Sequence, residues 1–150
     1  MVHARISFVG RAPRQTRIFH VPRMPLSYWR RPDYTEFAMS CLFCKIIDGS
    51  IPSASVYQDD LCYAFADINP QAPVHLLIVP RAHVASLDDT GSGDSALLGH
   101  LLSVAADIAR AKQLGGGYRV VVNTGRDGGQ SVDHLHLHLL GGRPLAWPPG

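Results

Sequence analysis

The sequence predicts an α+β domain in which an antiparallel sheet of about five strands packs against one long helix, with a short helix at its start. Segments of strand length, apolar or bounded by turn residues, recur along the chain, and only one segment has the length and periodicity of a long helix. The strands mostly precede or flank that helix. Regular alternation of strands and helices would instead favour a doubly wound α/β fold.

The first half of the domain contains the short helix and three strands. The helical pattern covers Cys41–Asp48, and Gly49 stops it. Turn residues and a proline separate the strands, which are Ser55–Gln58, Cys62–Asp67 after the turn Asp59-Asp60, and Val74–Val79 before Pro80.

The second half contains the long helix and two strands. Ser95–Leu114 has apolar residues on one helical face, with Asp94 suited to cap its start and Gly115 to end it. The predicted strands Tyr118–Asn123 and His134–Leu140 follow.

Charge divides the chain into two parts. Residues 1–38 hold seven Arg, no Lys, two acidic residues and four Pro, whereas residues 39–150 hold seven basic and ten acidic residues. We therefore expect a poorly ordered basic arm over residues 1–38 and a folded domain over residues 39–150. Met39 is a candidate native start. Upstream translated sequence, an Arg-rich organellar presequence and a functional basic arm are the alternatives for the arm.

Composition also argues against several classes of partner. The net charge of +2 does not suggest nucleic-acid binding, and no apolar run reaches the roughly 18 residues that span a bilayer. The three cysteines, with Cys41 and Cys44 in a Cys-x-x-Cys spacing, do not resemble a disulfide framework. We expect a cytoplasmic protein with no membrane partner.

Three alternating histidines, His134, His136 and His138, are the most informative feature of the chain. On a strand they share one face and the intervening leucines the other. Chance surface placement and a three-histidine metal site are alternatives, whereas an expression tag would be contiguous and terminal, which this run is not. The first and third histidines of one strand would lie about 13 Å apart, too far for one ion, so the three must have different roles. The preceding Gly128-Gly129 turn could hold an anion through its N–H groups.

These residues resemble the histidine-triad (HIT) family. The resemblance covers residues 41–150, most clearly Gly129-Gln130-Ser131-Val132-Asp133-His134-Leu135-His136-Leu137-His138. The sequences Asp67-Ile68-Asn69-Pro70 and His75-Leu76-Leu77-Ile78 are similar to its middle strands. The ending Trp147-Pro148-Pro149-Gly150 resembles the Hint branch. Asp133 departs from the pattern, which usually has a hydrophobic residue there, and puts the local packing in doubt.

The resemblance implies a nucleotide hydrolase that cleaves purine nucleoside phosphoramidates. His136 would attack phosphorus to form a nucleotidyl-histidine that water hydrolyses. A carbonyl of the neighbouring strand would hold its other ring N–H. His138, Ser131 and the N–H groups near Gly129 would stabilise charge, and Ser131 would protonate the leaving amine. His75 is a further candidate, or alternatively a buried, hydrogen-bonded histidine. This chemistry needs no cofactor.

The resemblance also implies nucleotide-binding residues. Asp67 would bind the ribose hydroxyls and Asn123 would lie near the phosphate or ribose. The remaining members are Ile68, Phe65, Phe43 and Ile51 around the purine, and Gly129, Gln130, Ser131 and His138 at the phosphate. From pattern alone the apolar members are equally typical of an ordinary core, and Asp67 of a turn.

A structural zinc ion is implied as well. The Cys-x-x-Cys spacing alone is compatible with zinc, redox chemistry or neither. Some HIT proteins bind zinc through this pair and two histidines, which match Cys41, Cys44, His83 and His134 here. The family is typically homodimeric. A dinucleoside polyphosphate hydrolase and a nucleotide-binding or protein-interaction module with little turnover are the alternative functions.

Overall fold

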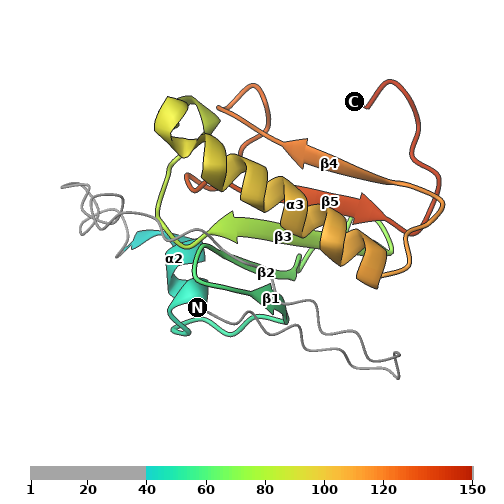
Figure 1. Cartoon of the computed structure of the whole chain (residues 1–150), viewed down its shortest axis with the longest axis horizontal. Coiled ribbons are helices and arrows are strands. Elements are labelled where there is room, and N and C mark those ends of the chain that lie inside the picture. Colours follow the sequence, from blue (N-terminus) through green and yellow to red (C-terminus); the bar gives the residue numbers. More distant parts are fainter. Residues whose placement is uncertain (1–39, 150) are drawn as a thin grey trace.

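The structure, a computed structural model, describes residues 40–149, and the elements occur in the predicted order (Figure 1). They are α2 (Leu42–Ile47), β1 (Ser55–Gln58), β2 (Cys62–Ala66), β3 (Val74–Pro80), two short 3-10 turns η2 (Leu87–Asp89) and η3 (Ser92–Asp94), α3 (Ser95–Ala111), β4 (Tyr118–Val122) and β5 (Leu137–Gly141). The predicted arm, residues 1–38, lies outside the described residues. No helix in the described part is long and apolar enough to cross a membrane.

The five strands form one antiparallel sheet in the order β1-β2-β3-β5-β4, which confirms the predicted α+β class. Helix α3 carries the chain from β3 to the far edge, where β4 begins, and β5 then returns between the two. In the register of β3 and β5, Leu77 lies opposite His138 and His75 lies opposite Leu140. The topology therefore places β5, which carries His138, inside the sheet between β3 and β4.

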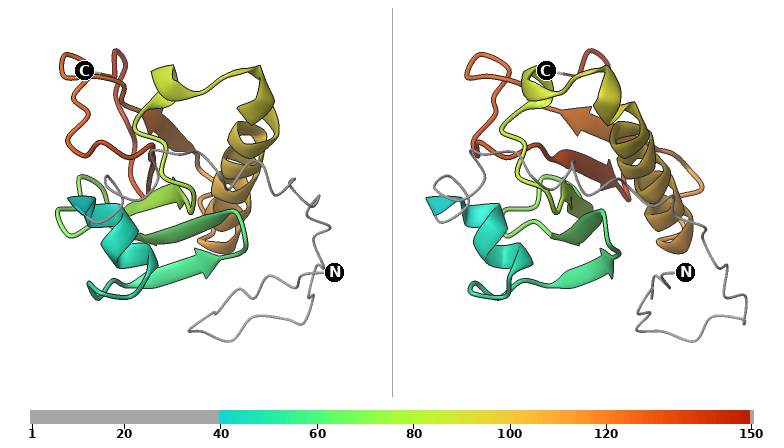
Figure 2. Two further views of the ribbon diagram at one scale, coloured as in Figure 1. Left: turned by 90° about the vertical axis from the view of Figure 1, so that its left-hand side faces the viewer. Right: turned by 60° about the vertical axis from the view of Figure 1, so that its left-hand side comes forward.

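The two faces of the sheet pack against different helices (Figure 2). On one face, Leu76 and Ile78 of β3 and Leu139 of β5 are buried in the core cluster that contains the apolar side of α3. On the other face, Leu77 and Val79 pack with Phe43 of α2. Because alternate side chains of a strand point to opposite faces, His75 and His138 lie on the α2 side.

The last strand begins at Leu137 rather than at His134, so this predicted boundary is wrong. The N–H of His134 bonds to the carbonyl of Val132, and that of Leu135 bonds to the carbonyl of Val84, outside the β3–β5 ladder. The predicted alternation persists, since Leu135, Leu137 and Leu139 all lie in the core cluster with α3. His134 and His136 thus occupy an irregular segment that leads into β5.

The long helix begins at Ser95 as predicted, but its C-terminal end and the role of Asp94 differ from the prediction. Helix α3 ends at Ala111, and Gln113 rather than Gly115 takes the left-handed conformation, with φ of 58°. The carboxylate of Asp94 makes no capping bond to α3 and instead accepts the N–H of Gly91 at 2.8 Å. The end of the short helix is as predicted, since Gly49 follows it with φ of 85°.

A buried carboxylate ties the β1–β2 turn to α3. Asp59 accepts hydrogen bonds from the hydroxyl of Tyr57 at 2.8 Å, the Nε2–H of His100 at 2.7 Å, and the N–H groups of Leu61 and Cys62. Burial opposes ionisation of Asp59, but these donors outweigh it and hold the pKa of its carboxyl well below the usual range. The turn residue is therefore an internal structural link between the sheet and α3.

Candidate active site and metal centre

Three histidines from two strands and the lead-in segment meet on the α2 side of the sheet. The rings of His136 and His138 lie with centroids 4.9 Å apart, and those of His75 and His138 lie 5.2 Å apart. His75 and His136 are buried, with 7% and 2% of their surface exposed. The structure therefore brings together His75, His136 and His138, all of which were predicted to act in catalysis.

The hydrogen bond of His136 defines which of its ring nitrogens carries a lone pair. Nδ1 lies 2.7 Å from the carbonyl oxygen of His134, and because a carbonyl can only accept, Nδ1 must carry the proton. In the neutral ring Nε2 is then unprotonated and nucleophilic. The acceptor is a carbonyl, as predicted, but it does not belong to a neighbouring strand. It lies two residues earlier in the same segment.

A second chain of hydrogen bonds sets the tautomers of the other two histidines. The main-chain N–H of Gln71 donates to Nδ1 of His75 at 3.1 Å, which leaves the proton of a neutral His75 on Nε2. That Nε2–H lies 2.9 Å from Nδ1 of His138, which accepts it. The proton of neutral His138 is then on Nε2, a buried atom with no hydrogen-bond partner among the described residues.

The electrostatic environment keeps His138 neutral. Burial, and next the neighbouring rings of His136 and His75, lower the pKa of His138 from 6.5 to about 4, although Asp67 opposes the shift. The site thus presents an unprotonated nitrogen of His136 beside an N–H of His138 that has no partner among residues 40–149. A nucleophile beside a donor suits attack on a phosphorus atom whose oxygens need hydrogen bonds.

The glycine-rich loop before the histidines is held by the side chain of Gln130. Its amide oxygen accepts the N–H of Gly125 at 3.0 Å, and its Nε2 donates to the carbonyls of Ala85 and Val132 at 2.7 and 2.9 Å. A Cβ on Gly128 would lie 2.3 Å from the carbonyl oxygen of Thr124, so this position requires glycine. The Gln130 side chain thus shapes the loop, while Ser131 and Gly129 are exposed.

The predicted purine-binding residues fall into two groups. Phe43 and Phe65 are buried in the core on the α2 side, and Ile51 packs against the same cluster. The side chain of Ile68, by contrast, is 100% exposed on the β2–β3 loop. Phe43 contacts the ring of His136 edge-on with centroids 5.2 Å apart, so part of this core also forms a wall beside the histidines.

The two polar nucleotide-binding candidates lie on separate loops. Asp67 follows β2, and one carboxylate oxygen accepts the N–H of Asn69 at 2.8 Å while the other lies 3.4 Å from Nε2 of His75. Asn123 follows β4, and its amide lies 3.5 Å from the carbonyl oxygen of Gly129. Asp67 is therefore beside the histidines, and Asn123 is beside the glycine-rich loop.

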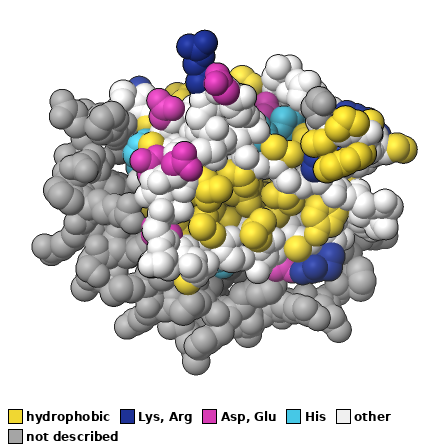
Figure 3. Space-filling view, turned by 90° about the horizontal axis from the view of Figure 1, so that it is seen from above, with side chains coloured by type: hydrophobic (Ala, Val, Ile, Leu, Met, Phe, Trp, Pro, Cys, Tyr) yellow, Lys and Arg dark blue, Asp and Glu magenta, His cyan; other side chains and the backbone are white. Residues whose placement is uncertain are grey.

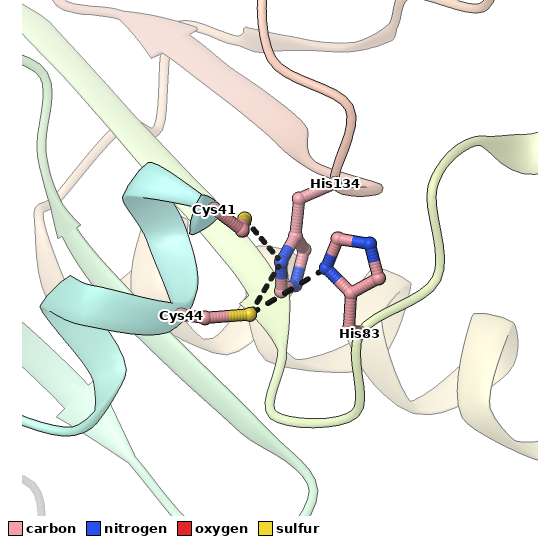
Figure 4. A group of neighbouring side chains, drawn as sticks. All are labelled: Cys41, Cys44, His83 and His134. Carbon is pink, nitrogen blue, oxygen red and sulfur yellow. Dashed lines mark hydrogen bonds between the residues drawn. The ribbon is translucent and has the colours of Figure 1, made fainter. Parts of the chain in front are cut away.

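The four predicted metal ligands converge between α2 and the histidine segment (Figure 4). Nδ1 of His134 lies 3.4 Å from the sulfur of Cys41 and 3.6 Å from that of Cys44, and Nδ1 of His83 lies 3.5 Å from the sulfur of Cys44. A tetrahedral zinc ion with ordinary bond lengths separates sulfur and nitrogen ligands by about 3.6 Å. The donor atoms are therefore spaced as zinc requires.

The protonation of these residues also fits a metal. Nε2 of His134 lies 2.9 Å from the carbonyl oxygen of Pro80 and must donate to it, so its Nδ1 lone pair faces the cysteines. Burial lowers the pKa of His134 to about 4 and also lowers the pKa of His83. Burial and the nearby Cys41 raise the pKa of Cys44 to about 12. This raised pKa favours the neutral thiol in the absence of a metal, and a bound cation would stabilise the thiolate that metal ligation requires.

Comparison with known proteins establishes the family. The HIT domain matches residues 48–145 of this chain. The chain belongs to the HIT family. It is 56% identical over 109 residues to an uncharacterized HIT-like protein of Synechococcus elongatus, an alignment that covers 73% of this chain and 96% of the relative.

Solved HIT structures share the fold of this HIT domain. A HIT family hydrolase from Legionella pneumophila is 52% identical, with a TM-score of 0.73 over 74% of this chain and 100% of that chain. A histidine triad nucleotide-binding protein from Candida albicans is 36% identical, with a TM-score of 0.63 over 73% and 83%. A zinc-bound member from Mycobacterium smegmatis is 33% identical, with a TM-score of 0.63 over 71% and 77%.

Several features of this HIT site could not be predicted from the sequence. The main-chain N–H of Gln71 and the carbonyls of His134 and Pro80 fix the histidine tautomers, yet main-chain groups leave no residue signature. Arg143 also contacts Gln71, through the carbonyl oxygen. The only available signal for the Gln71 loop was the turn-forming pair Asn69-Pro70.

Proposed function

We propose that this HIT protein hydrolyses purine nucleoside phosphoramidates through a nucleotidyl-histidine intermediate. The observation that carries the proposal is an unprotonated Nε2 on His136 next to an Nε2–H of His138 that no group in the described part of the chain accepts. A lone pair next to a buried donor suits a substrate whose reacting atom bears anionic oxygens.

In the first step, the lone pair of His136 Nε2 forms a bond to the α-phosphorus. The P–N bond of the substrate breaks, its electron pair stays on the leaving nitrogen, and that nitrogen takes a proton from the hydroxyl of Ser131. In the second step, water attacks phosphorus and the bond to His136 breaks. The proton of the water returns to Ser131, so the enzyme is regenerated and the nucleoside monophosphate is released.

The surrounding groups would stabilise the transferring phosphoryl group. His138 would donate its Nε2–H to a phosphate oxygen and thereby satisfy the buried donor. The hydroxyl of Ser131 would contact the same group from the loop side. The main-chain N–H groups of Gly129 and Gln130, which the sequence pattern suggested for this role, instead donate to the carbonyls of Arg126 and Gly125 within the loop. The carbonyl of His134 would stabilise positive charge on His136 once that ring carries the phosphoryl group.

We assign the nucleoside to the loop side of Asp67. The carboxylate oxygen of Asp67 that is not used by Asn69 would accept the ribose hydroxyls. The exposed side chain of Ile68 would cover the base, while Phe65, Phe43 and Ile51 would form the apolar wall behind it. Asn123 would lie near the phosphate or ribose.

The C-terminal sequence favours phosphoramidates over the alternatives. Trp147-Pro148-Pro149-Gly150 resembles the Hint branch rather than the branch that hydrolyses dinucleoside polyphosphates. Trp147 is 84% exposed, as suits a residue that contacts a substrate or a second subunit. A binding module with little turnover would not need the nucleophilic tautomer of His136.

We propose that Cys41, Cys44, His83 and His134 hold a structural zinc ion. The ion would cross-link α2 to the histidine segment and add to the stability of the fold. No step at phosphorus requires the metal. Cysteine ligands must stay reduced, which supports a cytoplasmic location.

We also propose a homodimer formed through β4. The strand order leaves one side of β4 without a strand partner in residues 40–149. Figure 3 looks onto the β4 side of the molecule and shows hydrophobic side chains gathered there. Among the exposed large hydrophobic residues, Tyr118 belongs to β4 and Leu102 to α3, with 43% and 53% of their surface exposed. An edge strand with such neighbours is suited to pairing with a second copy.

The function is tested by turnover of two substrates. Wild-type protein and the His136→Asn variant are incubated separately with adenosine phosphoramidate and with diadenosine polyphosphate. We expect the wild type to cleave the phosphoramidate faster, and the variant to lose about 10³-fold or more of kcat. Faster cleavage of the polyphosphate would favour the second hydrolase. Nucleotide binding without turnover of either would favour the binding module.

A further inference from the structure

The segment that follows β5 is fastened to the loop that precedes β3. The guanidinium of Arg143 donates through Nη2 to the carbonyl oxygen of Gln71 at 3.0 Å, and through Nη1 to the carbonyl oxygen of Pro144 at 3.0 Å. Gly142 has φ of 85°, and a Cβ there would lie 3.0 Å from Cβ of Pro73. The tail therefore approaches the Gln71 loop closely at two points.

The same loop residue contacts the histidines through its other main-chain group. The N–H of Gln71 donates to Nδ1 of His75 at 3.1 Å, and Nε2 of His75 lies 2.9 Å from Nδ1 of His138. Arg143 thus holds one side of Gln71 while His75 uses the other. A continuous chain of hydrogen bonds joins the exposed tail to the buried Nε2–H of His138.

We propose that Arg143 is a positioning residue that fixes the tautomers of His75 and His138. By holding the Gln71 carbonyl, the guanidinium keeps the Gln71 N–H directed at Nδ1 of His75. That donor keeps the His75 proton on Nε2, which in turn keeps the His138 proton on its own Nε2, facing the phosphate.

The chemistry of the residues supports this role. If the Gln71 N–H moves away, Nδ1 of His75 can carry the proton, and Nε2 of His75 can then accept from Nδ1–H of His138. That alternative leaves an unprotonated Nε2 on His138, which would repel phosphate oxygens instead of binding them. Arginine is suited to the clamp because its several N–H groups contact two carbonyls at once.

This inference rests on the proposed function for its kinetic consequence, but its structural part can be measured without substrate. Long-range ¹H–¹⁵N spectra of the histidine rings at pH 7 distinguish a protonated from an unprotonated ring nitrogen. We expect wild-type His138 to give two well-separated nitrogen shifts, with Nε2 protonated. In the Arg143→Gln variant the two shifts should move toward each other as both tautomers become populated.

Kinetics provide the second measurement. With adenosine phosphoramidate we expect Arg143→Gln to lower kcat about fivefold, the effect of one lost hydrogen bond, with a smaller change in KM. Arg143→Lys should restore part of the loss, because its ammonium can still donate to the Gln71 carbonyl. The matched control is Arg110→Gln, which removes an exposed arginine paired with Asp107 on α3, and it should match the wild type.

The outcomes separate the two proposals. Unchanged His138 nitrogen shifts in a folded Arg143→Gln variant would overturn the positioning role, as would an equal shift in the Arg110→Gln control. If the wild type does not cleave phosphoramidates, the proposed function fails, yet the spectra still decide the role of Arg143. Thermal unfolding of each variant shows whether it is folded. If Arg143→Gln does not fold, the spectrum of Arg143→Lys decides in its place: the two His138 shifts should move toward each other by a smaller amount, and unchanged shifts would overturn the role.

Discussion

The carbonyl oxygen of His134 accepts the Nδ1–H of His136 at 2.7 Å, while the ring of His134 points its own Nδ1 at the sulfur of Cys41, 3.4 Å away. One residue therefore contacts both centres, with its main chain at the candidate nucleophile and its side chain at the candidate metal. Phe43 lies between the cysteines in sequence and contacts both His134 and His136 edge-on. The candidate metal centre and the orientation of the candidate nucleophile are thus linked through His134 and Phe43.

Removal of the metal is expected to destabilise the fold more than it impairs chemistry. Chelation should lower the unfolding temperature by about 10 °C or more, because losing even about 2 kcal/mol has that effect on a domain of this size. Calorimetry and metal analysis of the purified protein measure this. Cys44→Ser should lose the metal, and Cys62→Ala, which changes the third cysteine, should keep it. Wild-type protein that is purified without metal from cells grown with zinc would contradict the assignment of a zinc site.

The neutral state of His138 predicts a loss of stability in acid. The pKa of His138 is lowered from 6.5 to about 4 in the folded protein, so between these values the unfolded chain binds a proton that the folded protein does not. The contribution of His138 to the stability of the fold is complete above pH 6.5 and is lost as the pH falls toward 4. From pH 7 to pH 5 we expect the free energy of unfolding to fall by about 1 kcal/mol, a value that allows for the solvent that reaches this half-buried ring.

Urea unfolding at pH 7 and at pH 5 measures this loss of stability. The His138→Gln variant has no titrating group at the position and should show a smaller loss than the wild type. Equal losses in the two proteins would show that other groups cause the pH dependence.

The fold and the residue types of the site could be predicted, whereas the proton positions could not. The alternation of leucines and histidines identified one core face, because a period of two survives even where the ladder is broken before Leu137. The strand boundary itself was missed because His134 and Leu135 bond to loop carbonyls. Gly115 was a reasonable helix stop, yet α3 ends at Ala111 and Gln113 takes the left-handed conformation that follows it.

Long-range main-chain contacts explain the other differences between the predicted site and the observed one. The side chain of Gln130 bonds to three main-chain groups, and no local pattern distinguishes such a clamp from a ligand-binding residue. The donors and acceptors that set the histidine tautomers belong to Gln71 and His134 main chain, which sequence patterns do not encode.

Asp67 is expected to recognise the ribose. The wild type should prefer adenosine phosphoramidate over its 2′,3′-dideoxy analogue by about tenfold or more in kcat/KM, as expected for hydrogen bonds to a charged group. Asp67→Asn should lose most of that preference while its activity on the dideoxy analogue changes little. Asp60→Asn, an exposed neighbour on the β1–β2 turn, is the control and should retain it. If Asp67→Asn kept the full wild-type preference for the ribose substrate over the dideoxy analogue, the ribose would bind elsewhere.

The proposed dimer predicts a response to charge on α3. Leu102→Glu places a carboxylate at an exposed apolar position and should shift the protein from dimer to monomer in sedimentation experiments. Ser103→Glu adds the same charge at the next residue, which is also exposed, and should remain dimeric. A monomeric wild type, or dissociation of both variants alike, would count against this interface.

The central claim is that His136 forms a covalent bond to phosphorus, and mass spectrometry of the reacting protein tests it most directly. Wild-type protein is mixed with excess adenosine phosphoramidate, denatured within the first turnover at alkaline pH, where a phosphorus–nitrogen bond survives, and digested. We predict an adenylyl group on the peptide that contains His136, and none in His136→Asn. Turnover without any adduct, or an adduct on another residue, would contradict the assignment of His136 as the nucleophile.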